Sequence, residues 1–176
     1  MQKSFWYLIA WVWKDGIPIQ ATISKAPGEM TLTSGYNTIG TTVPRSDISN
    51  SFRTLGVYIS PSGSQHKQVK ILRQYSDIYF INLSTAHLTP DEAYSSYMQF
   101  LRPKLIYPLP CCSLTQQQCR NIQAPALAAL LPKLHMNRHT PHVIIFGENK
   151  YGGLEFSDLY TDQCYGQLKL LIGHLK

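Results

Sequence analysis

The spacing of apolar residues changes once along this chain of 176 residues, near Ser60, and that change limits the folds it can adopt. Before Ser60, apolar and polar residues alternate in short runs between turn signals, a pattern typical of β-strands. After it, apolar residues recur at intervals of three and four, which predicts helices. We therefore expect an α+β protein, with antiparallel β-hairpins over residues 1–60 and a helical bundle over residues 61–176.

The first sixty residues predict a series of short strands joined by turns. Asp15-Gly16 is a strong hairpin dipeptide, and Pro27-Gly28 and Ser34-Gly35 mark two further turns. The apolar stretch around Trp11 is too short to span a bilayer and no small-residue cleavage site follows it, so we expect a strand there and no membrane partner. The expected strands are residues 4–14, 18–24, 29–33, 38–43 and 53–60.

The remaining residues predict helices with identifiable first residues. Thr89 precedes a proline and two acids, and Thr115 precedes Gln118 at the spacing of a capping box, so both threonines are expected to cap helices. Pro125 is expected to kink the second of these helices. The expected helices are residues 65–83, the segment after Thr89, residues 116–131, residues 140–146 and residues 159–176.

The charge balance favours an anionic partner. The formal net charge is +6 and the pI about 9.2, and from Pro61 to Lys150 nine Lys or Arg stand against four acids. A basic surface attracts nucleic acid or an acidic membrane without choosing between them. Four cysteines are too few and too unevenly placed for a disulfide framework, so the expected location is an intracellular, reducing compartment.

The sequence lacks the residue patterns that nucleotidyl transfer and zinc binding require. Two-metal nucleotidyl transfer needs clustered carboxylates, yet no Asp-Asp pair occurs, and Asp91-Glu92 is explained by helix capping. A zinc site is the tempting alternative, and its possible ligands are Cys112, Cys119, His135 and His139. The spacing between the two cysteines is too long for a zinc finger, so we expect buried thiols and surface histidines instead. A His-based nuclease or zinc hydrolase is therefore a distant alternative.

Six short segments, in order, carry a resemblance to a known family: residues 2–8 (QKSFWYL), 53–60 (RTLGVYIS), 138–142 (RHTPH), 151–154 (YGGL), 159–163 (LYTDQ) and 166–171 (GQLKLL). Together they resemble the part of LINE-type (non-LTR) retrotransposon reverse transcriptases that follows the catalytic aspartates, in the aromatic-rich version of microalgae, oomycetes and fungi. Glu155 stands where that family usually has a further glycine. The resemblance implies that the paired aspartates would lie before Gln2.

The resemblance implies a role for each half of the chain. Residues 1–60 would be the end of the palm and the primer grip, with Leu55, Gly56 and Val57 as the grip strand. The helices would be the thumb, which contacts the RNA or DNA template–primer duplex through Lys67, Lys70, Arg73, Arg138 and His139. Gly152 and Gly153 would permit a tight turn with positive φ.

The same resemblance implies no catalytic residue, metal ligand or cofactor in this chain; Mg²⁺ would belong to the full-length enzyme. Its other expected partner is the missing fingers–palm region of the same polyprotein. Two alternatives stay open. One is a non-catalytic protein-interaction domain or decayed retroelement remnant, whose apolar patch would drive self-association. The other concerns the basic loop around Arg138, which is either a solvated connection or a patch that contacts phosphates.

Overall fold

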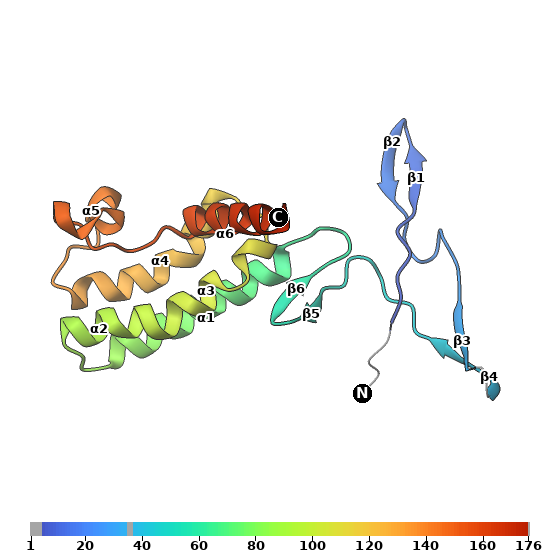
Figure 1. Ribbon diagram of the computed structural model, residues 1–176, viewed down its shortest axis with the longest axis horizontal. Coiled ribbons are helices and arrows are strands. Elements are labelled where there is room, and N and C mark those ends of the chain that lie inside the picture. The colour runs from blue at the N-terminus through green and yellow to red at the C-terminus, as the bar shows by residue number, and fades with distance from the viewer. Residues whose placement is uncertain (1–4, 35–36, 176) are drawn as a thin grey trace. The chain divides into compact units, whose positions relative to one another are not determined.

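The computed structural model describes residues 5–34 and 37–175, and the chain separates into two compact units, Met1–Ser64 and Gln65–Lys176. The first, the hairpin unit, holds all the strands named below, and the second, the helical unit, holds all the helices (Figure 1). This arrangement confirms the expected α+β class. We expected the division after Ser60, and the two units meet between Ser64 and Gln65.

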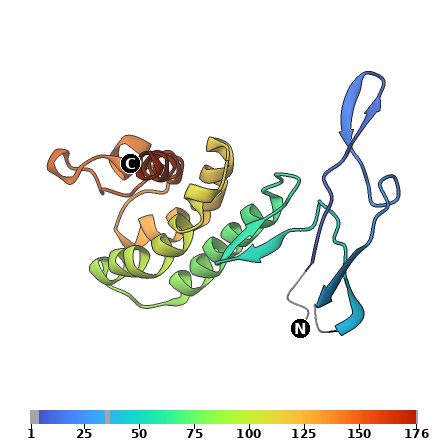
Figure 2. The ribbon, with the colours of Figure 1, turned by 45° about the vertical axis from the view of Figure 1, so that its right-hand side comes forward.

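The hairpin unit contains three two-stranded antiparallel sheets, each formed by strands adjacent in sequence (Figure 2). At the first turn, Asp15 and Gly16 have φ values of 52° and 77°. Two successive residues in the left-handed region characterise the turn that best joins two twisted strands, so the hairpin predicted from this dipeptide is confirmed. The pairs are β1 (Trp11–Lys14) with β2 (Ile17–Gln20), β3 (Met30–Ser34) with β4 (Asn37–Val43), and β5 (Phe52–Thr54) with β6 (Val57–Ile59).

The first expected strand is wrong over most of its length. Only Trp11–Lys14 is a strand, and Ser4 lies outside the described residues. Ahead of β1, Trp6 makes an isolated bridge with Arg45, and its indole Nε1 donates to the Val43 carbonyl at 3.1 Å. The Arg45 guanidinium lies 5.0 Å from the centre of the Trp6 ring. Trp6, one of the aromatic residues that suggested a strand, thus contacts residues 43–45 instead.

Two further boundaries differ from the sequence prediction. β2 ends at Gln20 rather than at residue 24. The next turn begins at Thr22, whose carbonyl accepts the amides of Lys25 and Ala26 at 3.0 and 3.2 Å. The turn was predicted at Pro27-Gly28, but it forms before that dipeptide.

The single strand expected over residues 53–60 is also wrong. Leu55 and Gly56 have φ values of 48° and 88°, and they form the turn of the β5–β6 hairpin. Thr54 pairs with Val57 across this turn. Very short strands on either side of a glycine give the same alternation as one longer strand, which explains the error.

The helical unit follows the predicted order, and no helix among its described residues is long and apolar enough to cross a bilayer. Both threonines cap helices as predicted, and each forms a capping box: the Glu92 and Gln118 amides donate to the side chains of Thr89 and Thr115, and each threonine amide donates in return to the side chain of Glu92 or Gln118. The elements are α1 (His66–Thr85), α2 (Pro90–Ser96), a π-helical turn η1 (Tyr97–Leu101), α3 (Arg102–Ile106), the 3-10 turn η2 (Leu109–Cys111), α4 (Gln116–Lys133), α5 (His142–Phe146), the 3-10 turn η3 (Asn149–Tyr151) and α6 (Leu159–His174).

The core of the helical unit forms around Tyr97. Its ring meets Phe156 edge to face at 5.0 Å, and its hydroxyl accepts a hydrogen bond from Gln123 Nε2 at 3.1 Å. Burial raises the pKa of Tyr97 to about 12, so the hydroxyl is neutral throughout the physiological range. Gln123 Nε2 also donates to the Ser157 carbonyl at 2.9 Å. This polar contact ties α4 to the segment before α6.

Candidate nucleic-acid interface

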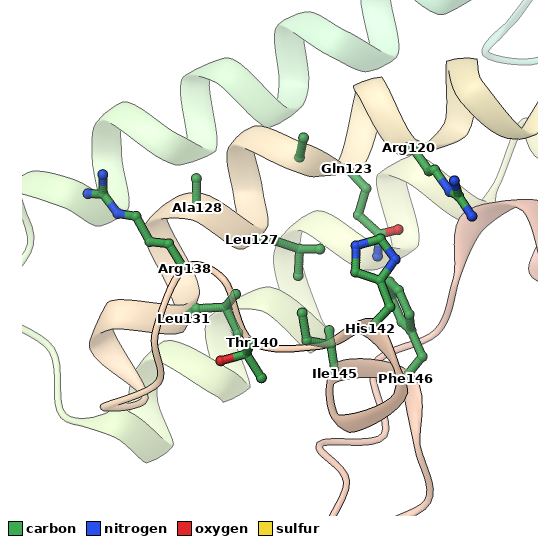
Figure 3. A pocket seen from close by; sticks show the side chains of 11 residues that line it. Arg120, Gln123, Leu127, Ala128, Leu131, Arg138, Thr140, His142, Ile145 and Phe146 are labelled. Carbon is green, nitrogen blue, oxygen red and sulfur yellow. The ribbon is translucent and has the colours of Figure 1, made fainter.

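A cavity of about 220 Å³ opens between α4 and the segment that contains α5 (Figure 3). We call it the α4–α5 groove. Its apolar lining consists of Ala124, Leu127, Ala128, Leu131, Ile145 and Phe146. Its polar lining consists of Arg120, Gln123, Arg138, Thr140 and His142. Among the described residues that line it there is no carboxylate, so every fixed charge at this groove is positive.

The groove has a cation near each end and apolar side chains between them. Figure 3 shows Arg138 beside Ala128 of α4, whereas Arg120 lies toward the end occupied by His142. The chain after α4 therefore returns alongside that helix in the opposite direction. The His142 and Phe146 rings meet edge to face at 5.6 Å, so they support one another at this end of the groove.

The wall formed by α5 is held in place by the segment that follows it. The amides of Leu154 and Phe156 donate to the carbonyls of Ile144 and Ile145 at 2.9 and 3.1 Å. The Glu155 amide donates to the Gly147 carbonyl at 2.9 Å. These three bonds form a short ladder, which satisfies the last carbonyls of a helix too short to be stable alone.

The two glycines of the Tyr-Gly-Gly-Leu segment have different roles. Gly152 has a φ of 82°, as the expected turn requires. Gly153 is not in the left-handed region, so the shared role expected for the pair needs correction. A Cβ on Gly153 would lie 2.7 Å from the Gly147 Cα and closer still to its carbonyl group. Gly153 is needed because two backbone segments approach closely there.

The loop after α4 is ordered around Asn137. Its Oδ1 accepts the His139 amide at 2.9 Å, and its carbonyl accepts the Thr140 amide at 3.0 Å and the Thr140 hydroxyl at 2.6 Å. This local turn leaves the side chains of Arg138 and His139 exposed. Lys133, which precedes the loop, is instead used within the protein, because its Nζ donates to the Ala86 carbonyl at 2.7 Å.

The structure does not gather the basic residues proposed from sequence into one site. Lys67 and Lys70 lie exposed in the first turns of α1, a helix about 30 Å long at 1.5 Å per residue. Figure 1 shows the start of α1 at one end of the helical unit and α5 at the other. Lys67 and Lys70 are therefore distant from Arg138, and any shared ligand must be extended.

Arg73 is engaged within the helical unit. Its Nε lies 3.0 Å from Asp77 Oδ1, one turn further along α1, and its guanidinium also donates to the Asn121 carbonyl of α4. These contacts connect α1 with α4. The positive charge of Arg73 is thus balanced by an acid on the same surface, which weakens its attraction for a phosphate.

Sequence reasoning did not select Arg120, although a signal was available. Arg120, Leu127 and Leu131 are spaced by seven and four residues in α4 and so lie on one helical face. His142 was recognised as part of the basic loop, and it lies at the same end of the groove as Arg120 (Figure 3). What the spacing could not show was that the loop returns along this face.

The residues expected to form a grip strand are instead at the tip of a hairpin. Leu55 is 86% exposed in the turn between β5 and β6, with Gly56 beside it, whereas Val57 is buried within the hairpin unit. The structure therefore presents a protruding apolar side chain rather than a flat strand.

The possible zinc ligands do not form a metal site. Cys112 and Cys119 are buried, and burial raises the pKa of each thiol to about 11. His135 and His139 are exposed. In the described part of the chain, no three His, Cys, Asp or Glu side chains are close enough together to hold a metal ion.

Comparison with known proteins gives one informative match. The chain is 27% identical over 117 residues to the retrovirus-related Pol polyprotein from type-1 retrotransposable element R2 of Popillia japonica. The match supports a retroelement origin. It covers 66% of this chain and 16% of the polyprotein, so this chain spans a small part of its relative's length. No protein-family profile and no solved structure matches it.

Proposed function

We propose that this chain is the post-catalytic part of a LINE-type reverse transcriptase, and that its helical unit acts as a thumb that holds nucleic acid by the phosphate backbone. The observation that carries the proposal is the α4–α5 groove, in which Arg120 and Arg138 are the charged side chains, in a chain similar to a Pol polyprotein. Guanidinium groups suit phosphate because their N–H donors match its oxygens.

The basic residues of the helical unit suit a long ligand better than a small one. Arg120 and Arg138 flank the groove, and Lys67 and Lys70 lie at the start of α1. A template–primer duplex carries closely spaced charges along its whole length and can reach both groups. A ligand with one phosphate could use only one of them.

In this proposal the hairpin unit is the end of the palm together with the primer grip. In the same proposal Leu55, at the exposed tip of the β5–β6 hairpin, contacts the primer. Mg²⁺ would belong to the region of the polyprotein that carries the paired aspartates. The expected compartment is intracellular and reducing.

A salt titration of duplex binding tests this function. We expect the affinity for a DNA or RNA–DNA duplex to fall by orders of magnitude from about 50 mM to about 200 mM salt if several phosphates are contacted. Arg120→Ala and Arg138→Ala should each weaken binding and lower the magnitude of the salt slope by about 0.9. Lys169→Ala, on α6, removes one exposed charge outside the groove and is the control. Binding that ignores salt would contradict the proposal.

Primer extension provides a separate test. The chain has no adjacent pair of aspartates, so we expect no nucleotide incorporation with Mg²⁺ or Mn²⁺. Robust template-dependent synthesis by the purified chain would contradict the assignment to the post-catalytic region.

A second candidate function is protein interaction without nucleic-acid binding, and the surface of the hairpin unit favours it. Trp11, Trp13 and Ile17 are 57%, 71% and 64% exposed on one short hairpin. The strand register places Trp11 and Trp13 on one face of this hairpin and Ile17 on the other. An exposed pair of tryptophans is typical of a surface that another protein covers. Oligomers that bind no duplex would favour this function over the first.

A further inference from the structure

The floor of the α4–α5 groove is not explained by contacts to a duplex backbone. Phosphates require cations and hydrogen-bond donors, and a convex basic surface would serve them. Leu127, Ile145 and Phe146 instead give the groove an apolar floor between its two arginines (Figure 3). A ligand that fits must present an apolar surface flanked by negative charge.

A single nucleotide of an unpaired strand has this chemistry. Its base has two apolar faces, which stack on aromatic and aliphatic side chains, and phosphates lie on both sides of it along the strand. The His142–Phe146 pair supplies aromatic surface at one end of the floor. A cavity of about 220 Å³ is below the usual range for drug-sized ligands, so it suits one base rather than a larger group.

Gln123, a polar residue that lines the groove, fits the same ligand. Both hydrogens of the Gln123 amide are directed inward, because its Nε2 donates to the Tyr97 hydroxyl and to the Ser157 carbonyl. The side-chain carbonyl oxygen of Gln123 is therefore the group available to a ligand in the groove, and it can accept a hydrogen bond from a base amino group. Gln123 is only 2% exposed, so its amide is fixed before any ligand arrives.

The spacing of the arginines fits a strand. Arg120 and Ala128 are separated by eight residues, about 12 Å along α4, and Arg138 lies beside Ala128 (Figure 3). One phosphate cannot contact both arginines at that separation, whereas successive phosphates on the two sides of a base can. The lack of a carboxylate among the described lining residues removes the repulsion that such a strand would otherwise meet.

We propose that the α4–α5 groove binds one unpaired nucleotide of a single strand, with the base on Leu127 and Phe146 and the flanking phosphates on Arg120 and Arg138. This inference rests on the proposed function, since the strand would be a single-stranded extension of the duplex held by the helical unit. A surface that binds phosphates alone does not distinguish paired from unpaired nucleic acid. With a base bound in the groove, the helical unit does.

The test compares two probes on the full chain by fluorescence anisotropy. One is a blunt duplex, and the other is the same duplex with a short unpaired extension that contains 2-aminopurine. We expect the extension to increase affinity about tenfold, near the lower end of what one stacked base contributes, and the 2-aminopurine emission to change on binding.

Ala124→Glu is the decisive variant, because Ala124 is exposed, lines the groove and tolerates a longer helix-forming side chain. The new carboxylate should abolish the gain from the extension while the blunt duplex is still bound. Gln117→Glu adds the same charge to an exposed position of α4 outside the groove and should keep the gain. If Ala124→Glu does not fold, as judged by circular dichroism, Ala128→Glu, which also places a carboxylate in the groove, replaces it with the same expectation.

Two kinds of result would overturn the inference alone. In the first, the native chain binds both probes equally, or Ala124→Glu keeps the gain. In the second, an acidic peptide displaces the extended probe as effectively as a single strand does, which makes the groove a peptide site. If the extension is bound through the groove but the blunt duplex is not, the proposed duplex-holding function fails and the groove assignment stands.

Discussion

At the residue scale, Gly153 has the most direct effect on the groove, because it allows the following segment to lie against α5. A Cβ there would overlap Gly147. We expect Gly153→Ala to destabilise the fold by about 1–3 kcal/mol, the usual effect of overpacking against backbone, as measured by thermal unfolding. Gly173→Ala in α6 is the control: its Cβ would meet nothing within 4 Å, so alanine should stabilise the helix slightly. Equal melting temperatures for the two variants would contradict this account.

Glu155 is a second residue whose backbone matters more than its charge. Its φ of 53° is in the left-handed region, where a side chain is strained, and its Oε1 accepts the Asn149 amide at 3.0 Å. Glycine and alanine would both lose that hydrogen bond, but only glycine relieves the strain. We expect Glu155→Gly to be more stable than Glu155→Ala by about 1 kcal/mol in urea unfolding. The reverse order would show that the turn adopts another conformation.

At the element scale, local signals predicted helices well and hairpins less well. Thr89 and Thr115 begin helices as predicted because capping depends on residues within one turn of each other. The segment around Leu55 and Gly56 misled because alternation cannot distinguish one strand from two paired short ones. The groove was not predictable, since Arg120 and Arg138 are brought to it by a loop whose direction is set by tertiary contacts.

The capping box at the start of α2 leads to a prediction about pH. Hydrogen bonds from the backbone and side chain of Thr89 lower the pKa of Glu92 below its ordinary value. A carboxyl whose pKa is depressed by folding adds stability above its unfolded pKa and loses it as pH falls through the folded pKa. The stability advantage of the native chain over Glu92→Gln should therefore shrink between about pH 6 and about pH 3, across the ordinary range of a glutamate. An advantage that does not change with pH would contradict the role of the ionised carboxylate.

At the scale of the whole molecule, the two units differ in how completely they bury their apolar residues. The helical unit has a continuous core that includes Leu72, Ile122 and Leu130, each fully buried. Among the residues of the hairpin unit whose burial is described, few large side chains are buried, and two-stranded hairpins are marginal alone in water. We infer that the hairpin unit is completed by a covering surface, which the proposed function supplies from the adjoining polyprotein.

That inference predicts how the isolated chain behaves. On the β1–β2 hairpin Trp13 pairs with Pro18 and Lys14 with Ile17, and Trp13 and Ile17 are both well exposed. Without a covering surface, such hairpins associate through their apolar side chains and unpaired edges. We expect the average mass in sedimentation to rise with concentration, and the double variant Trp13→Lys/Ile17→Lys to reduce that rise. Val143→Lys, at an exposed apolar position of the helical unit, should leave it unchanged.

Duplex binding measured on the same variants separates the two candidate functions. If the hairpin surface normally meets the rest of the polyprotein, Trp13→Lys/Ile17→Lys should reduce association while the affinity for a duplex remains, because the proposed contacts of Arg120 and Arg138 belong to the helical unit. If association is the function in its own right, native oligomers will bind no duplex at any salt concentration. A native chain that stays monomeric at every concentration would instead show that the hairpin unit needs no covering surface.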